Sequence, residues 1–426
     1  MKALVLTWEF PPLISGGLGM ACYGLYKSLL EQGVQADLVL PTTEAIYFPL
    51  RQPEDADTLP HAYLGDKAQV KPKVEKTGAL VERLRLLGVS LNPESYLTPG
   101  FHFERSLAWL AGTREADLFR MTLAGDGNLF KKVQEYTAHV VASFSRWPCD
   151  VIHAHDWLTY PAGVLLQGLL KKPLVVHIHA TEFDRAGGPG DGRIHHIEYT
   201  GLEKADRVIA VSQYTAGMVM SRYQIDPAKI RVVHNAYSLP EHAVSRWKLF
   251  RDPVVLFMGR VTLQKGPDYF LEVAQRVIAQ FPKVRFVMAG RGDMFSRILK
   301  SSAAKRLKDR FLLTDFLDRE EVARILSATD IFLLPSVSEP FGIVPLEAMA
   351  YGAAAIVSKQ SGVSEVIQNA FKVDFWDVEK TAEIVLRLLK NPEEREAMAF
   401  AGKKEVMAIG WKEAAEKTRQ IFRELS

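Results

Sequence analysis

The sequence predicts an α/β protein with two doubly wound parallel sheets that face each other across a cleft. Three observations support this prediction. Short apolar runs, typical of buried parallel strands, alternate with amphipathic helical patterns along most of the chain. Two such series, each opening with a strand and a glycine-containing loop, are separated by the weakly patterned residues 235–252. The length of 426 residues suffices for two or three domains.

Composition and charge are those of an ordinary globular protein. Hydrophobic residues make up 48% and charged residues 24%, and the net charge of +3 gives no reason to propose nucleic acid as a partner. No stretch approaches the roughly 20 apolar residues of a membrane span, which leaves only peripheral membrane contact open. Cys22 and Cys149 cannot build a disulfide framework, and the apolar run in residues 1–7 is too short for a signal peptide. We therefore expect a cytoplasmic protein.

The first half opens with a strand, a loop, a helix and a second strand. We predict strands at 2–7 and 36–40 and a helix over 20–32 that ends at Gly33. The loop before the helix reads SGGLG, with Gly16 and Gly17 as its paired glycines. This order is typical of nucleotide-binding folds, although the third glycine of the dinucleotide fingerprint is missing. We expect the glycines to let the backbone approach a ligand; the alternative is a plain turn that needs positive φ.

Residues 42–126 have the least regular pattern. They mix proline-rich segments with helical ones, such as 76–87, and are too long for one connecting loop in a compact domain. We predict an insertion with its own elements that shapes an acceptor site.

The remainder of the first half alternates regularly. The predicted strands are 150–153, 173–179, 207–211 and 230–234. The predicted helices are 129–147, 158–171, 193–205 and 212–223. Ser212 suits the N-cap of the last of these helices, because its hydroxyl accepts a bond from an unpaired backbone N–H.

Polar residues follow two of these strands. Asp156 lies in the run HAHDW, and His179 ends a strand just before the polar, glycine-rich loop 180–192. We expect Asp156 to reach into the cleft and His179 to contact a ligand, the alternative for His179 being a hydrogen-bonded core residue. His153 and His155 beside Asp156 also suggest a metal, but no third run of ligands is evident and we predict none.

The second half repeats the alternation. The predicted strands are 254–258, 284–289, 311–314, 331–335 and 353–357. The predicted helices are 268–280, 318–327, 344–351, 380–389, 392–407 and 411–425. A turn, GRGD, begins at Gly290.

The loop GRVTLQKG carries two cations, Arg260 and Lys265, directly after the first strand of this half. Loops at the carboxyl ends of strands face the ligand crevice of an open α/β sheet. Two cations there would neutralise a diphosphate. The alternative is a pair of solvated surface charges.

The run SVSEPFGIVPLEAMAYG, residues 336–352, joins a predicted strand to a predicted helix. Glu339 and Glu347 bracket the helix N-terminus, whose unpaired N–H groups bind anions. The backbone between the glutamates begins with Pro340, Phe341, Gly342, Ile343 and Val344. Because carboxylates accept hydrogen bonds from hydroxyls, a ligand with both phosphate and hydroxyl groups, such as a nucleotide sugar, explains the combination. The alternative is a helix-dipole partner and a solvent-facing helix residue.

These motifs together resemble those of the retaining glycosyltransferases of the GT-B fold, family four, and are similar to those of the glycogen and starch synthases. The resemblance covers nearly the whole chain except 42–126. Its most specific part is SEPFGIVPLEAMAYG, in which Glu339 and Glu347 match the two glutamates of the family. GRVTLQKG, SGGLG and HAHDW match further family motifs, and His179 matches the active-site histidine.

The resemblance implies two Rossmann-like domains facing across a cleft. Residues 1–240 with the C-terminal helix 411–426 would form the acceptor-side domain, and residues 250–410 would bind the nucleotide sugar. The implied reaction transfers a hexose, with glucose expected first, from a nucleotide-diphosphate sugar to an acceptor hydroxyl with retained anomeric configuration. It needs neither a metal nor another cofactor, and the acceptor is a carbohydrate or another hydroxyl compound, with α-glucan as one candidate.

The resemblance also implies roles for single residues. Glu339 would bind hydroxyls of the transferred sugar and Glu347 those of the ribose, while Arg260 and Lys265 would bind the diphosphate. His179 would contact the donor sugar, and Asp156 would help to place the acceptor. The implied catalytic residues are His179, Asp156, Glu339, Arg260 and Lys265. The implied nucleotide-sugar site comprises Gly16, Gly17, Arg260, Lys265, Gly290, Glu339, Phe341, Gly342, Ile343, Val344 and Glu347.

One departure from the pattern bears on the substrate. Synthases that use ADP-glucose carry a lysine two residues before the paired glycines, whereas this chain has Ile14 there. A general hexosyltransferase is therefore our first expectation, with glucan elongation of the glycogen or starch synthase type as the alternative. Two rivals on the same fold are a nucleotide-sugar epimerase and a non-catalytic binding protein.

Overall fold

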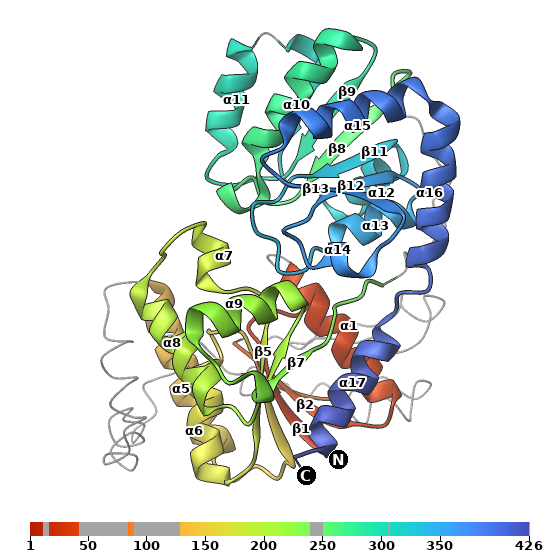
Figure 1. Ribbon diagram of the computed structural model, residues 1–426. Coiled ribbons are helices and arrows are strands. Elements are labelled where there is room, and N and C mark those ends of the chain that lie inside the picture. The colour runs from red at the N-terminus through yellow and green to blue at the C-terminus, as the bar shows by residue number, and fades with distance from the viewer. Residues whose placement is uncertain (12–16, 42–83, 89–127, 239–249, 306, 426) are drawn as a thin grey trace, which may run out of the picture.

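The computed structural model describes residues 1–11, 17–41, 84–88, 128–238, 250–305 and 307–425. They form two α/β units, each with helices around a central sheet (Figure 1). All strand pairs within these sheets are parallel. The predicted fold class, two doubly wound parallel sheets, is thereby confirmed.

The first sheet has seven strands in the order β3-β2-β1-β4-β5-β6-β7. Their bounds are β1 (Lys2–Leu6), β2 (Gln35–Leu40), β3 (Leu84–Gly88), β4 (Val151–His155), β5 (Leu174–Ile178), β6 (Arg207–Ala210) and β7 (Ile230–Val232). The helices of this unit are α1 (Gly17–Glu31), α5 (Asn128–Phe144), α6 (Tyr160–Leu170), α7 (Glu182–Ala186), α8 (Gly192–Lys204) and α9 (Gln213–Tyr223).

Both faces of this sheet are buried, which explains why its strands read as continuous apolar runs. Along β1, Ala3 and Val5 join one core cluster, while Leu4 and Leu6 join the other. This alternation follows from the two-residue period of a strand, since a helix layer covers each face.

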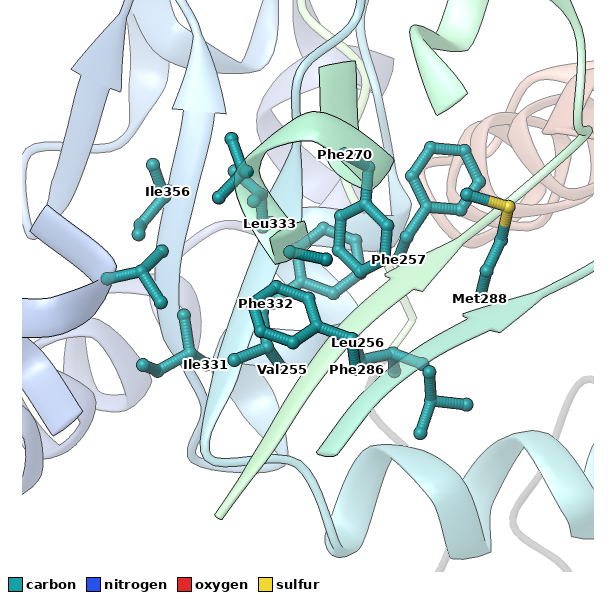
Figure 2. Close-up of a cluster of buried hydrophobic side chains, with 14 of the residues drawn as sticks. Val255, Leu256, Phe257, Phe270, Phe286, Met288, Ile331, Phe332, Leu333 and Ile356 are labelled. Carbon is teal, nitrogen blue, oxygen red and sulfur yellow. The ribbon is translucent and has the colours of Figure 1, made fainter. Parts of the chain in front are cut away.

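The second sheet has six strands in the order β10-β9-β8-β11-β12-β13. Their bounds are β8 (Val254–Met258), β9 (Arg285–Ala289), β10 (Phe311–Thr314), β11 (Ile331–Leu334), β12 (Ala354–Ser358) and β13 (Ala370–Val373). The helices are α10 (Pro267–Gln280), α11 (Phe295–Ala304), α12 (Arg319–Ser327), α13 (Val344–Ala350), α14 (Val363–Val366), α15 (Val378–Lys390) and α16 (Pro392–Val406). Figure 2 shows the aromatic and aliphatic side chains that fill this core, among them Phe257, Phe270, Phe286 and Phe332.

The last helix, α17 (Trp411–Arg423), leaves the second unit and packs against α1 of the first (Figure 1). Trp411 and Phe422 join the same core cluster as Leu25 of α1. The chain therefore crosses between the units twice, once after β7 and once before α17. The division into residues 1–240 with 411–426 and 250–410 stays a prediction.

Four local features differ from the expectations. The segment from Leu84 is strand β3, paired with β2, rather than the end of a helix over 76–87. The loop 180–192 contains α7, which begins with a capping box between Thr181 and Asp184. Helix α11 and strand β13 were not predicted at all. Strands β3 and β13 and helix α7 are too short to show a clear periodicity, so that sheet pairing or capping decides them.

None of the described helices combines the length and the apolar character that a membrane span requires. The paired glycine Gly16 and the departure at Ile14 lie outside the described residues, as does most of the insertion 42–126.

The contact between α1 and α17 gives a stability prediction. A Cβ at Gly24 would overlap the indole of Trp411, whereas one at Gly168 of α6 would meet open space. We expect Gly24→Ala to lower the free energy of unfolding by about 1–3 kcal/mol, the usual cost of overpacking. Gly168→Ala, the matched control, should be neutral or slightly stabilising because alanine favours helix. Chemical denaturation measures both; equal stability of the two variants would contradict the packing of α17.

Candidate active site

Most of the predicted site residues lie just beyond the carboxyl ends of strands. Arg260 and Lys265 follow β8, and Glu339 follows β11, which is hydrogen-bonded to β8. Asp156 follows β4, and His179 follows its neighbour β5. The fold thus produces two groups, one on each sheet.

In the second unit, Lys265 and Glu339 form a direct ion pair. Glu339 is only 5% exposed, and Ser336 Oγ donates to its Oε2 at 3.3 Å. Its backbone is fixed as well, because the Glu339 N–H donates to Gln360 O at 2.9 Å. A carboxylate buried to this extent depends on its cation, since removal of one partner leaves an uncompensated charge.

The loop from Arg260 to Gly266 packs closely against the segment that follows β11. Gln264 O accepts the Val337 N–H at 2.9 Å, and a Cβ at Gly266, whose φ is +68°, would overlap Pro335 O. These contacts hold Lys265 against Glu339. Arg260 is exposed and makes a 3.4 Å contact with Gln264 Oε1, so its guanidinium is accessible to an anion.

The turn before α13 needs glycine at one position. Gly342 has a φ of +93°, and a Cβ there would lie 3.0 Å from Glu339 Cγ. Within the described residues, the N–H groups of Gly342, Ile343 and Val344 have no hydrogen-bond acceptor. Unpaired N–H groups at a helix N-terminus can bind an anion. Phe341 is buried in an apolar cluster that also contains Val211 of the first unit.

Glu347 lies on α13 with its carboxyl partly buried and, in the described part of the chain, without an ion pair or hydrogen bond. Burial raises the pKa of Glu347 to about 7. Burial raises the pKa of the phenols of Tyr237 and Tyr351, and the negative charge of Glu347 raises both pKa values further. A carboxylate in this setting would be stabilised by hydroxyl donors from a ligand.

In the first unit, Asp156 and His179 are linked directly. The His179 N–H donates to Asp156 Oδ1 at 2.7 Å, and the Asp156 N–H donates to His177 O at 3.0 Å. Asp156 has a φ of +58°, a left-handed conformation that is uncommon outside glycine, asparagine and aspartate. Its side chain is only 8% exposed, so that it is held by the His179 N–H instead of projecting into open space. The carboxylate therefore positions His179, and a contact with an acceptor stays a prediction.

His179 is half-buried, and burial lowers the pKa of its imidazole below the ordinary value. The ring is consequently neutral near pH 7. Its Nε2 lies 2.9 Å from His155 Nδ1, and its Nδ1 has no hydrogen-bond partner.

A half-buried arginine supports this group. Arg185 of α7 pairs with Glu198 and with Glu182, donates to Ala180 O, and lies 4.0 Å from Asp156 Oδ2. Arg185 was not among the predicted site residues, although Thr181 and Asp184 match a capping box that could have indicated a helix here.

Polar contacts join the two units beside Glu339. Ser338 Oγ donates to Asp184 of α7 and accepts from Tyr214 Oη at 3.0 Å. Ser212 Oγ and Thr215 Oγ1 both donate to Pro340 O. Helix α7 also contacts the turn Leu263–Lys265. These contacts bring the His179 group and the Lys265 group to the same junction, where α7 lies between the units (Figure 1).

Glu365 makes a further link between the units. It accepts the N–H groups of Gln213 and Tyr214, both at 2.8 Å, and His234 Nε2 lies 2.7 Å from it. The sequence analysis assigned no role to Glu365, because its partners lie more than 100 residues away.

Of two glycines of the predicted site, Gly290 has surroundings that require glycine and Gly17 does not. Gly290 has a φ of +131°, and a Cβ there would overlap Gly259 O of the neighbouring loop. Gly17 begins α1 and has open space around it. Ligand contact by either glycine stays a prediction.

Two family models match the chain. Residues 115–239 match the model described as "Glycosyltransferase Family 4", and residues 245–405 match that described as "Glycosyl transferases group 1". The two matches lie in the first and second units respectively.

Curated relatives match over almost the full chain. An uncharacterized glycosyltransferase of Methanocaldococcus jannaschii is 27% identical, with 99% of this chain and 98% of the relative covered. A glycogen synthase of Mycobacterium tuberculosis is 24% identical, with 99% and 94% covered.

Solved structures share the fold. A sucrose-phosphate synthase from Thermosynechococcus elongatus has a TM-score of 0.71 at 20% identity, covering 100% of this chain and 98% of its own. HepE of Anabaena, solved with UDP and glucose, has a TM-score of 0.67 at 16% identity, covering 100% and 99%. The catalytic domain of starch synthase IV from Arabidopsis thaliana, bound to ADP and acarbose, has a TM-score of 0.65 at 16% identity, covering 99% and 98%.

The unpaired carboxyl of Glu347 gives a pH-dependent prediction. Its raised pKa means that the folded protein binds a proton more tightly than the unfolded chain, so stability falls as pH rises from about 4.5 through 7. Glu347→Gln removes this loss. We expect the variant to match the parent near pH 4.5 and to exceed it by on the order of 2 kcal/mol at pH 8.

Denaturation at the two pH values measures the effect. Glu396→Gln, a change on the exposed face of α16, is the matched control and should show no such gain. A Glu347→Gln variant that is equally stable, or less stable, at pH 8 would contradict the desolvation of this carboxyl.

Proposed function

Because the chain belongs to the glycosyltransferases of the GT-B fold, we propose that it transfers a hexose, with glucose expected first, from a nucleotide-diphosphate sugar to an acceptor hydroxyl. The observation that carries the proposal is the buried pair of Lys265 and Glu339, with exposed Arg260 beside it and His179 at the same junction. This set combines cations that can bind phosphate with a carboxylate and an imidazole that can bind hydroxyls.

The diphosphate would bind to Arg260, Lys265 and the unpaired N–H groups of residues 342–344. In the transition state the sugar–phosphate bond lengthens and negative charge grows on the departing diphosphate. Fixed cations and N–H dipoles stabilise that charge without having to reorganise. Lys265 is already oriented by its pair with Glu339.

The two glutamates would bind different hydroxyls of the donor. Glu339 lies next to the phosphate-binding lysine, which suits the transferred sugar. Glu347 lies one helical turn into α13, which suits the ribose, and its unpaired carboxyl accepts hydroxyl hydrogen bonds in place of the lost water.

The opposite unit would supply His179. A neutral imidazole, fixed through its backbone by Asp156, contacts the sugar without adding positive charge beside an oxocarbenium-like centre. We infer retained anomeric configuration, with the departing phosphate oxygen accepting the proton of the attacking hydroxyl. The bond from the anomeric carbon to phosphate oxygen breaks as the bond to the acceptor oxygen forms. Two cations serve the diphosphate, and we propose that transfer needs no metal.

A carbohydrate acceptor is supported by the named relatives. A glycogen synthase matches almost the whole chain, and the starch synthase IV structure holds ADP and acarbose. The HepE structure holds UDP and glucose, so both bases occur among proteins with this fold. Glucan elongation is therefore the second candidate, although Ile14 replaces the lysine expected of ADP-glucose synthases.

The test is a panel of nucleotide sugars incubated with the protein, with and without glucan, while free nucleoside diphosphate is measured. We expect release with at least one donor and retention of the anomeric configuration in the product. Epimerised donor without an acceptor would support an epimerase instead, and absence of both products would favour a non-catalytic binding protein.

Lys265→Ala should lower turnover by about 10²–10³-fold, the usual effect of losing a group that stabilises transition-state charge. Lys404→Ala, which removes an exposed lysine of α16, is the matched control and should keep parental turnover. Because Lys265 also pairs with buried Glu339, circular dichroism must show that the variant is folded. Parental turnover in folded Lys265→Ala would contradict the role of this lysine.

Metal independence is tested by the same release assay in excess EDTA. We expect unchanged turnover, because Arg260 and Lys265 supply the positive charge that a magnesium ion supplies elsewhere. Loss of turnover in EDTA that added Mg²⁺ restores would show that a cation carries part of this charge.

A further inference from the structure

Four histidines line one face of the first sheet. His153 and His155 alternate along β4, and His177 and His179 alternate along β5 and its end. The register pairs His155 with His177, so all four side chains point to the same face. Their rings lie close together, with centroids 4.2–5.5 Å apart for the neighbouring pairs.

A buried cysteine of α1 meets this group. Cys22 Sγ lies 3.5 Å from His155 Nδ1, and the same nitrogen lies 2.9 Å from His179 Nε2. These three donor atoms all lie within 4.8 Å of one another. They come from three elements that are far apart in sequence, and only the packing of α1 on the sheet brings them together.

Hydrogen bonding alone does not satisfy this arrangement. A ring nitrogen of a neutral histidine either donates one proton or accepts through one lone pair. The Cys22 thiol has a second partner in Thr7, whose Oγ1 lies 3.2 Å from Sγ, but His155 Nδ1 faces both the thiol and a second imidazole nitrogen. In addition, His179 Nδ1 and both nitrogens of His153 and of His177 are buried without a hydrogen-bond partner. Buried polar atoms without partners are rare, and each indicates a function or a missing ligand.

We propose that Cys22, His155 and His179 bind a transition-metal ion of the zinc class. Zinc binds thiolate sulfur at about 2.3 Å and imidazole nitrogen at about 2.0–2.1 Å in tetrahedral geometry, which places sulfur and nitrogen ligands about 3.6 Å apart and two nitrogens about 3.4 Å apart. The sulfur–nitrogen separation of 3.5 Å already fits, and the nitrogen–nitrogen separation of 2.9 Å must open slightly.

The chemistry of the donors selects the metal. Thiolate and imidazole favour zinc, cobalt or copper over magnesium, which prefers oxygen ligands. Imidazole binds metal in its neutral form and cysteine as thiolate, so the thiol proton of Cys22 is released as the metal–sulfur bond forms. Half-buried His179 provides access for the ion, whereas the set of His153, His155 and His177 is fully buried.

Metal binding would affect catalysis through His179. A metal on His179 Nε2 fixes the ring toward Cys22 and away from the donor sugar. Zinc is therefore an inhibitor of transfer, and transfer itself proceeds without metal. This consequence rests on the proposed function, but the binding of metal does not.

The test is a titration of the untagged full chain with Co²⁺, followed by absorption spectroscopy. We expect visible bands of tetrahedral cobalt together with a near-ultraviolet thiolate-to-cobalt charge-transfer band. Cys22→Ser should lose the charge-transfer band. Cys149→Ser, which changes the other buried free cysteine, is the matched control and should keep it. Cys22→Ala replaces the serine variant if circular dichroism shows that Cys22→Ser is unfolded.

Three outcomes would overturn the proposal. They are no cobalt bands in the parent protein, a charge-transfer band that persists without Cys22, and visible bands without any thiolate band. The last would place the ion on His153, His155 and His177.

The inhibition is measured separately in the nucleotide-release assay. Zinc should lower turnover of the parent at least tenfold, a chelator should restore it, and Cys22→Ser should resist zinc. Cobalt bands that require Cys22 with unchanged turnover would refute the inhibition and leave the binding site standing. No turnover under any condition would refute the proposed function, and the cobalt spectra would still decide the metal site.

Discussion

The buried ion pair between Lys265 and Glu339 is the interaction on which the site depends. Neither charge is stable in this position without the other, because both are largely withdrawn from water. The pair requires that β8 and β11 be neighbours, that Gly266 lie against Pro335, and that Gly342 take a positive φ beside Glu339. These constraints leave Arg260 and the turn before α13 beside the pair, where a diphosphate would be neutralised.

The same segment also holds the two units together. Pro340 O accepts from Ser212 and Thr215, Ser338 bonds to Asp184, and Phe341 enters an apolar cluster shared with the first unit. The binding loop is therefore part of the junction between the sheets. A ligand that moved this segment would therefore move the junction between the two sheets as well.

Burial sets the electrostatics on both sides of the junction. Glu347 is desolvated without a cation, and the histidines of the first sheet are desolvated as well, which for His179 outweighs the charge of nearby Asp156. The carboxyl pKa therefore rises and the imidazole pKa values fall. A buried group without a partner lowers the stability of the folded protein, and it gains a partner when a ligand or metal binds. Sites are commonly less stable than the rest of a protein for this reason.

The sequence by itself determined the alternation of strands and helices, the two series, the loops that carry Arg260, Lys265 and Glu339, and the helix that carries Glu347. These features depend on local periodicity and on fixed spacing. Only the tertiary structure decided that Asp156 accepts the backbone N–H of His179 and that Cys22 reaches His155. Register, helix packing and burial control these contacts between residues distant in sequence, and no local pattern encodes them. The short elements β3 and α7 likewise depended on sheet pairing and on a cap.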